Sequence, residues 1–139
     1  MNTLISYLRY KREHLWKYID ADGKFGFQCM DLIRNYCKEV YWFNMWVTSQ
    51  ARDVNNTHTL PGRKKLIIWT EDFKKWDIII LDLWKYWHIG IVDKIEKDWI
   101  SILEQNGSWK WSWQKIPWNE IRVKKYPRWK VINCFRFVK

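Results

Sequence analysis

The chain changes its hydrophobic period once, and this change constrains the fold more than any other feature of the sequence. Up to about residue 41, apolar residues recur at helical spacing, whereas after residue 76 they form short runs rich in β-branched residues. Helical spacing indicates amphipathic helices, and short β-branched runs between charged turns indicate strands. Helices followed by neighbouring strands predict an α+β domain, with N-terminal helices packed on one face of an antiparallel sheet.

Two helices are predicted in the first part of the chain. The first covers residues 1–18, where apolar residues stand at roughly helical spacing, at Leu4, Ile5, Leu8 and Leu15. Gly23 and Gly26 end this pattern. The second helix begins at Cys29, and its apolar face is formed by Ile33, Tyr36, Cys37 and Val40.

A long surface loop and then five strands are predicted after the helices. The loop covers residues 48–65, which are polar and include Pro61 and Gly62. The strands cover residues 77–83, 88–95, 99–105, 119–126 and 131–138. We therefore expect an antiparallel meander in a sheet of about five or six strands. No repeat or linker divides residues 1–139, so the chain is expected to be one domain.

Charge and cysteine content narrow the class of protein. Lysine and arginine number 25 against 15 acidic residues, a net charge of +10, which predicts attraction to polyanions such as nucleic acid, acidic membranes or anionic cell-wall polymers. No apolar run approaches the roughly 18 residues of a membrane span. Arg9, Lys11 and Arg12 stand where a signal peptide needs its apolar stretch. The three cysteines are too few for a disulfide framework. Because their number is odd, at least one is a free thiol or pairs with another chain.

Cys29 is the cysteine with the placement of a nucleophile. The start of a helix favours the thiolate, which is the attacking species in thiol catalysis. His88 opens one strand and Glu104 closes a later one, so a meander could bring a base and an orienting carboxylate over the helix start. Taken alone, Cys29 could also be a small buried hydrophobe, which is our interpretation of Cys37 and Cys134. The remaining histidines are interpreted as solvated side chains: His14 and His58.

Four motifs occur in order along the chain, "DADGKFGFQCMDL", "WDIII", "WHIGIV" and "ILEQNG". Together they resemble the CHAP domains, the cysteine- and histidine-dependent amidohydrolases and peptidases of the papain-like NlpC/P60 group, and most of all those of phage endolysins. The resemblance covers nearly the whole chain and implies a papain-like CHAP fold. It implies Cys29 as nucleophile, His88 as general base and then acid, and Glu104 as the group that orients His88. Asn106 would be a further polar member of the site, and the Cys29 backbone N–H with the Gln28 side chain would stabilise the oxyanion.

An acidic loop precedes the nucleophile. Asp20, Asp22 and Asp31 echo the spacing of an EF-hand, although the glycine and the fifth position depart from that motif. The resemblance to endolysin CHAP domains implies instead that calcium binds the side chains of these three aspartates and the carbonyl oxygens of Lys24 and Gly26. The alternative is that Asp20 and Asp22 cap a turn, while Asp31 favours the helix N-terminus.

The resemblance implies a lysin-like peptidoglycan hydrolase that cleaves an amide or peptide bond of the cell-wall peptide. It would be a cysteine endopeptidase or an N-acetylmuramoyl-L-alanine amidase, monomeric, and released from the host cytoplasm to the wall or carried in the virion. One alternative is a wall-binding module that has lost catalysis. Another is a nucleic-acid-binding domain, motivated by basic and aromatic residues in "WKWSWQKIPWNEIRVKKYPRWK". That alternative leaves the four motifs unexplained, so nucleic acid is not expected as a partner.

Tryptophan is abundant where glycine is scarce. The chain has 13 tryptophans and 5 glycines, whereas an average content of about 7% predicts about ten glycines. Trp76 and Trp87 stand where CHAP domains commonly have glycine, and "GSWKWSWQ" would be an ordinary turn with glycine at Trp109, Trp111 and Trp113. We hypothesise that some of these tryptophans are UGA codons decoded as glycine. Genuine tryptophans would instead offer an aromatic groove for sugar or peptide, with strain wherever φ is positive.

Overall fold

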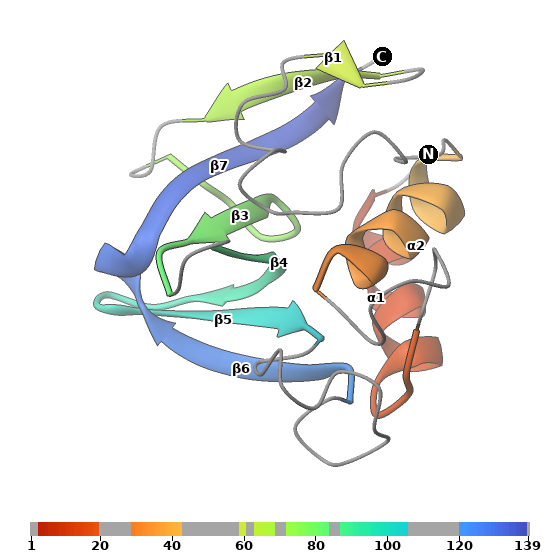
Figure 1. Cartoon of the computed structure of the whole chain (residues 1–139), viewed down its shortest axis with the longest axis horizontal. Coiled ribbons are helices and arrows are strands. Elements are labelled where there is room, and N and C mark those ends of the chain that lie inside the picture. Colours follow the sequence, from red (N-terminus) through yellow and green to blue (C-terminus); the bar gives the residue numbers. More distant parts are fainter. Residues whose placement is uncertain are drawn as a thin grey trace.

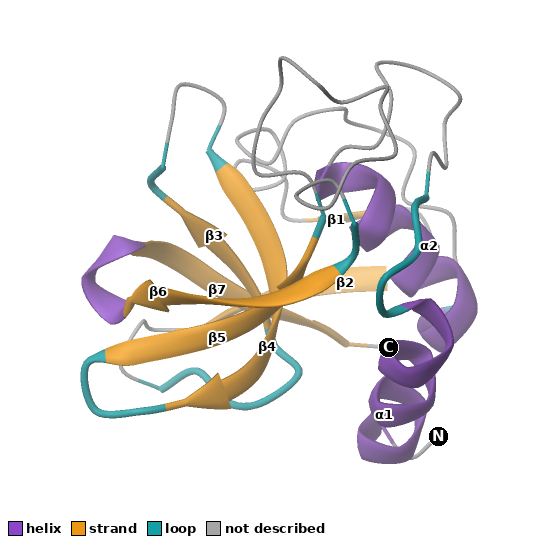
Figure 2. Ribbon diagram, turned by 90° about the horizontal axis from the view of Figure 1, so that it is seen from below, coloured by secondary structure: helices purple, strands orange, loops and turns teal. Residues whose placement is uncertain are grey.

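Two helices and one curved antiparallel sheet make up the described part of the chain, which comprises residues 3–19, 29–42, 59–60, 63–68, 72–83, 87–105 and 120–138 of a computed structural model. The helices are α1 (Thr3–His14) and α2 (Cys29–Tyr41). The strands are β1 (Thr59–Leu60), β2 (Arg63–Ile68), β3 (Ile78–Leu81), β4 (His88–Ile95), β5 (Trp99–Glu104), β6 (Arg122–Pro127) and β7 (Val131–Val138). Both helices lie on the same side of the sheet (Figure 1, Figure 2).

The strands pair in the order β1-β2-β7-β3-β4-β5-β6, and every pair is antiparallel. Strands β3 to β6 form the expected meander. Strand β7 departs from it, because after the short 3-10 helix η3 (Arg128–Lys130) it crosses back to lie between β2 and β3. The α+β class and the antiparallel sheet are therefore confirmed, and the meander prediction holds only as far as β6.

Strands β1 and β2 correct the prediction of a loop over residues 48–65. Within the described residues, β1 and the start of β2 fall in that range. The aliphatic run from Leu66 to Ile68 completes β2 and pairs with β7, with Ile68 opposite Cys134. The basic residues that open β2 made the stretch resemble a loop. The five predicted strands correspond to β3 to β7, and β1 and β2 extend this sheet at one edge.

The first helix is confirmed, but it ends at His14, and its buried face includes two tyrosines that the sequence analysis did not predict. Tyr7 and Tyr10 are 0% and 2% exposed, whereas Leu8 is 51% exposed. Tyrosine can be buried here because its hydroxyl finds a partner: Tyr7 donates to Asp93 Oδ1 at 2.8 Å and Tyr10 to Asn35 Oδ1 at 2.8 Å. Neither helix of the described residues is long and apolar enough to cross a membrane.

The second helix buries the face that the sequence predicts, formed by Ile33, Tyr36, Cys37 and Val40. These residues join the core between the helices and the sheet, where Ile78 and Ile80 of β3 also lie. The alternate residues of β3, Ile79 and Leu81, belong to a second core on the other face, together with Phe73 and Tyr126. Because side chains alternate along a strand, the buried run of β3 fills both cores. The sheet is therefore buried on both faces at its centre.

Candidate active site

Cys29 is the first residue of α2, and it is half-buried at the margin of the core between helices and sheet. The first backbone N–H groups of a helix have no partner within the helix, so they create a positive field at this point. Helix α2 packs against β4 through its apolar face. This packing places the thiol near the start of β4, where the next member of the site lies.

His88 and Glu104 meet because β4 and β5 run antiparallel. His88 is the first residue of β4 and Glu104 is the last residue of β5, so the two strand ends are neighbours. Both side chains are fully buried, and His88 Nε2 lies 3.5 Å from Glu104 Oε1. Contacts of this kind are often long in a free enzyme and shorten when substrate binds. The pair has the geometry of a base and the carboxylate that orients it.

Hydrogen bonds and charge around His88 favour its protonated form. Burial lowers the pKa of the imidazole, but hydrogen bonds with Cys29 and Glu104 and the charges of both groups outweigh burial and raise the pKa to about 9. At neutral pH the ring is therefore an imidazolium. The imidazolium thus lies beside both Cys29 and Glu104, and hydrogen bonds connect the three side chains.

The carboxylate of Glu104 is held in its charged form by several neighbours. Burial raises the pKa of this carboxyl group, but its hydrogen bond and charge interaction with His88, the hydroxyl of Tyr126 and the charge of Arg122 together lower the pKa below its usual value. Tyr126 donates a hydrogen bond to Oε1, the oxygen that faces His88. Arg122 Nε lies 3.7 Å from Oε2. A buried charge is tolerated only with such partners.

Sequence analysis missed Tyr126 and Arg122 as neighbours of Glu104. Arg122 is opposite Glu104 in the β5–β6 register, whereas Tyr126 is opposite Ile100 and reaches Glu104 along the strand. The one large aromatic residue within the basic strand "RVKKYP" was an available signal. This signal could not show that the residue contacts Glu104, because the register between the strands is not known from the sequence.

Gly90 shapes the strand that carries His88. A Cβ atom at this position would lie 2.6 Å from Ile102 Cδ1 and 3.0 Å from the backbone oxygen of Leu103. Only glycine lets Ile102 of β5 pack this closely over β4, which joins the two strands just beyond the His88–Glu104 pair. The glycine therefore supports the approach of the two strand ends.

Three of the predicted site residues are thus brought together, namely Cys29, His88 and Glu104. Their catalytic roles stay predictions. The other predicted members of the site lie outside the described residues: the catalytic Asn106, the oxyanion residue Gln28, and the calcium ligands Asp20, Asp22, Lys24 and Gly26.

Asp31 is the one predicted calcium ligand among the described residues. It lies in the first turn of α2, is 1% exposed, and its Oδ1 is 4.0 Å from Arg34 Nη1. A buried carboxylate at this position suits both interpretations, because it favours the helix N-terminus and is also the oxygen donor that calcium prefers. The acidic side chain fits a calcium site, and Arg34 balances part of its charge.

The remaining described cysteines and histidine have surroundings unlike those of Cys29 and His88. Cys37 and Cys134 are fully buried, as expected for small hydrophobes, and burial raises the pKa of both thiols. His14, interpreted from the sequence as a solvated side chain, is partly exposed and also has two neighbours. Its Nε2 lies 2.8 Å from Glu39 Oε2, and its ring packs 4.3 Å from the ring of Tyr10. The other histidine, His58, lies outside the described residues.

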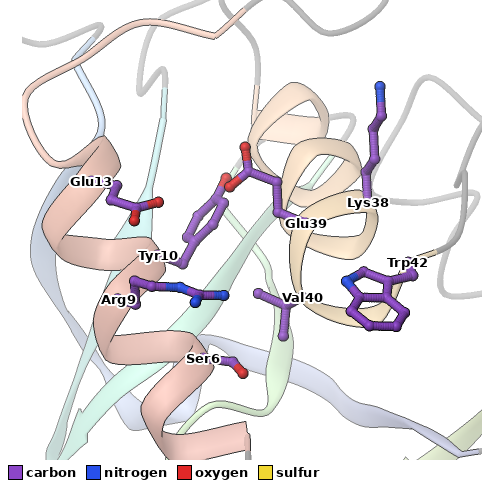
Figure 3. A pocket seen from close by; sticks show the side chains of 8 residues that line it. All are labelled: Ser6, Arg9, Tyr10, Glu13, Lys38, Glu39, Val40 and Trp42. Atoms are coloured by element: carbon purple, nitrogen blue, oxygen red, sulfur yellow. The ribbon is translucent and has the colours of Figure 1, made fainter. Parts of the chain in front are cut away.

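A hollow of about 370 Å³ lies between α1 and α2 (Figure 3). Arg9, Glu13 and Glu39 point into it from the two helices, and Trp42 lies at its margin. Its lining does not include Cys29, His88 or Glu104. We therefore assign no catalytic role to this hollow.

Comparisons with known proteins bear on the family and the fold of the chain. The family model of the CHAP domain matches residues 18–106, a range that contains Cys29, His88 and Glu104. The endolysin LysIME-EF1 has a similar structure, with 20% identity and a TM-score of 0.76 over 98% of this chain and 64% of that chain. Ly7917 is 16% identical, with a TM-score of 0.67 over 97% of this chain and 62% of that one. No curated protein sequence gives a significant match.

The chain spans less than two thirds of each of these two solved proteins. The likeness shows that the fold, two helices on a curved antiparallel sheet, is shared with endolysin structures. The family model covers more than half of the chain and includes the thiol, the imidazole and the carboxylate that converge in space. The chain therefore belongs to the CHAP domain family.

Proposed function

We propose that this domain is a peptidoglycan hydrolase that cleaves an amide or peptide bond of the bacterial cell-wall peptide by cysteine catalysis. The observation that carries the proposal is the meeting of Cys29, His88 and Glu104 from three separate elements. An enzyme that uses a thiol needs this combination of nucleophile, base and orienting group. The structural likeness to an endolysin supports the choice of substrate.

We infer the reaction from the roles proposed for these groups. The sulfur of Cys29 attacks the carbonyl carbon of the scissile bond, and the backbone N–H at the start of α2, with Gln28, stabilises the oxyanion. The imidazolium of His88 then donates its proton to the departing amine, which leaves a thioester. Neutral His88 takes a proton from water, and the hydroxide attacks the thioester carbon. The C–S bond then breaks, which releases the carboxylic acid and restores the Cys29 thiolate beside the His88 imidazolium. Glu104 stabilises the imidazolium and holds its orientation throughout.

Digestion of purified peptidoglycan tests the proposal. The parent protein is expected to release soluble fragments, and mass spectrometry of the new termini will distinguish an endopeptidase from an amidase. Cys29→Ala is expected to abolish release while the domain keeps its melting temperature. Equal release by Cys29→Ala and parent, or no release by folded parent protein, would contradict the proposal, and wall binding by the inactive protein would then favour a binding module.

Selective alkylation gives an independent test of the nucleophile. Cys29 is half-buried, whereas Cys37 and Cys134 are fully buried. Brief treatment of the native protein with iodoacetamide is therefore expected to modify Cys29 first and to abolish activity in proportion to that modification. Activity that survives complete modification of Cys29 would remove this residue from the mechanism.

Calcium is the proposed cofactor of the same domain. Asp31 lies two residues after Cys29, and together with Asp20, Asp22 and the carbonyl oxygens of Lys24 and Gly26 it would supply the hard oxygen ligands that calcium prefers. The ion would neutralise these carboxylates and fix the segment that leads into α2. We expect a chelator to lower both the melting temperature and the activity, and added calcium to restore both. Unchanged values after chelation would exclude calcium from this role.

A further inference from the structure

Tyr126 makes an interaction in the candidate site to which neither the motifs nor the mechanism assigns a role. The residue is 7% exposed, and its hydroxyl donates to Glu104 Oε1, the same oxygen that faces His88 Nε2. The rings of Tyr126 and His88 have centroids 6.1 Å apart. Burial and the charge of Glu104 raise the pKa of the Tyr126 hydroxyl, so it stays protonated and acts as a donor.

We propose that Tyr126 is a positioning residue, which holds the carboxylate of Glu104 against His88. A carboxylate on the end of β5 can rotate about its own bonds, and Arg122 at 3.7 Å makes only a loose contact with the other oxygen. The hydrogen bond from Tyr126 restrains Oε1, because Tyr126 is held in the second core, on the face of the sheet opposite the helices. This role rests on the proposed function of Glu104 as the orienting group.

The test is Tyr126→Phe, with Tyr7→Phe as its matched control. Tyr7 also donates to a carboxylate, that of Asp93 at 2.8 Å, but outside the site. We expect Tyr126→Phe to lower kcat/KM by about 10-fold to 100-fold, as for the loss of a hydrogen bond to a charged group. We also expect NMR to show that the pKa of the Glu104 carboxyl group rises, because its anion loses a donor.

The control separates positioning from general destabilisation. Tyr7→Phe is expected to leave both kcat/KM and the titration of Glu104 unchanged. An unchanged Glu104 titration in Tyr126→Phe, or an equal loss of kcat/KM in Tyr7→Phe, would overturn the proposal. The NMR measurement needs no substrate, so it gives an answer even if the domain proves to act on a different bond.

An independent observation concerns the backbone at tryptophan residues. Four described residues other than glycine have positive φ, and all four are tryptophans: Trp16 (68°), Trp42 (59°), Trp76 (70°) and Trp87 (58°). Two further tryptophans lie in the described part of the chain, Trp99 and Trp129, and neither has positive φ. Positive φ is uncommon for residues with a side chain and is an outlier for a bulky one, whereas glycine adopts it freely.

The local structure at these positions calls for glycine. Trp42 directly follows α2, which ends at Tyr41, and this is the position where a left-handed glycine terminates many helices. Trp76 is the third residue of a turn closed by the bond from Asp77 N–H to Lys74 O at 3.2 Å, and positive φ there defines a turn that requires glycine. Trp16 follows the end of α1, and Trp87 precedes the first residue of β4.

We infer that positions 16, 42, 76 and 87 are glycine in the protein made by its source organism, where UGA codons are decoded as glycine. The shortage of glycine in the sequence has the same explanation. At position 87 the exchange would remove a large ring next to His88. Tandem mass spectrometry of the native protein is expected to find glycine at these four positions, and the gene is expected to have UGA at each. Tryptophan in the native peptides would overturn the inference.

A stability series tests the same inference on recombinant protein. Trp16 and Trp42 are 62% and 80% exposed, so replacing them removes little packing. We expect the glycine variants Trp16→Gly and Trp42→Gly to melt about 2–8 °C above the corresponding alanine variants, since alanine retains the strained Cβ. At the exposed control Trp129, in η3, alanine is expected to be at least as stable as glycine. The inference would be overturned if glycine and alanine variants ranked in the same order of stability at positions 16, 42 and 129.

Discussion

At the scale of single residues, surroundings rather than residue type separate the three cysteines. Cys37 and Cys134 are closed into the two cores, where burial raises the pKa of each thiol and keeps it protonated. Cys29 lies at the start of a helix and beside a protonated imidazole. A protonated thiol is a poor nucleophile, so of these three residues only Cys29 has the surroundings that thiol catalysis needs.

The buried imidazole predicts a pH dependence of stability. The pKa of His88 is about 9 in the folded protein, against an ordinary value of 6.5. The folded state therefore binds this proton more tightly than the unfolded state, so the stabilisation is complete below about pH 6.5 and is lost as the pH rises through about 9. Urea denaturation at several pH values is expected to show the free energy of unfolding falling across this interval.

His88→Gln is the control for this pH dependence. The variant has no group that titrates at this position, so its free energy of unfolding is expected to change less between pH 6.5 and 9. Glu104 acts at the acid end, where its lowered pKa means that stability is lost as the carboxylate becomes protonated. A decline in His88→Gln as steep as that of the parent between pH 6.5 and 9 would assign the effect to another group.

The sequence predicted the meeting of Cys29, His88 and Glu104 because each residue stands at the end of an element. The order of antiparallel strands is enough to bring the start of β4 beside the end of β5. Tyr126 could not be found in this way. Its contact with Glu104 depends on the β5–β6 register and on the direction of a long side chain, and neither property is local in sequence.

At the scale of elements, the spacing of apolar residues predicted the helices and strands, but it did not predict which strands pair. Both helices and the five strands β3 to β7 follow from the spacing of apolar residues. The place of β7 between β2 and β3 joins segments far apart in the chain, so local spacing does not determine it. The buried face of α1 was also beyond prediction, because Tyr7 and Tyr10 depend on acceptors from β4 and α2.

Because β4 and β5 lie so close together at Gly90, one added methyl group at this position is expected to destabilise the domain. Gly90→Ala is expected to lower the free energy of unfolding by about 1–3 kcal/mol, because the new Cβ overlaps the side chain of Ile102 and presses on the backbone of β5. Urea denaturation measures the loss. The expected reduction in activity follows from separation of the strand ends that carry His88 and Glu104.

A second substitution distinguishes this contact from a general loss of stability. Ile102→Val removes Cδ1, the atom nearest to the new Cβ. In the double variant, the cost of Gly90→Ala is expected to be smaller than in the parent, although the contact with the Leu103 backbone oxygen remains. If the two substitutions lower the free energy of unfolding by amounts that simply add in the double variant, the proposed overlap is contradicted.

At the scale of the whole molecule, the net charge of +10 bears on which partners attract the domain. Bacterial walls carry anionic polymers, and a basic protein is attracted to them without a dedicated binding site. Such attraction between exposed charges weakens as salt shortens the screening length. The charge thus supports anionic wall polymers as a class of partner for the proposed hydrolase.

Wall binding is therefore expected to depend on salt. With Cys29→Ala, which leaves the wall undigested, the fraction of protein that sediments with purified walls is expected to fall several-fold between about 50 mM and 500 mM NaCl, where the Debye length shortens. Walls stripped of anionic polymers are expected to bind less at low salt. Binding that is insensitive to both changes would point to a specific contact with peptidoglycan in place of charge attraction.

The proposed nucleophile and its two proposed partners belong to different elements of the fold. Cys29 belongs to a helix, whereas His88 and Glu104 belong to the sheet, and apolar packing between α2 and β4 sets their spacing. A slight slip of the helix would break the chemistry while every strand stayed paired. On warming, activity is accordingly expected to disappear before the β-sheet signal in circular dichroism. Loss of activity would then report the loss of packing between α2 and the sheet.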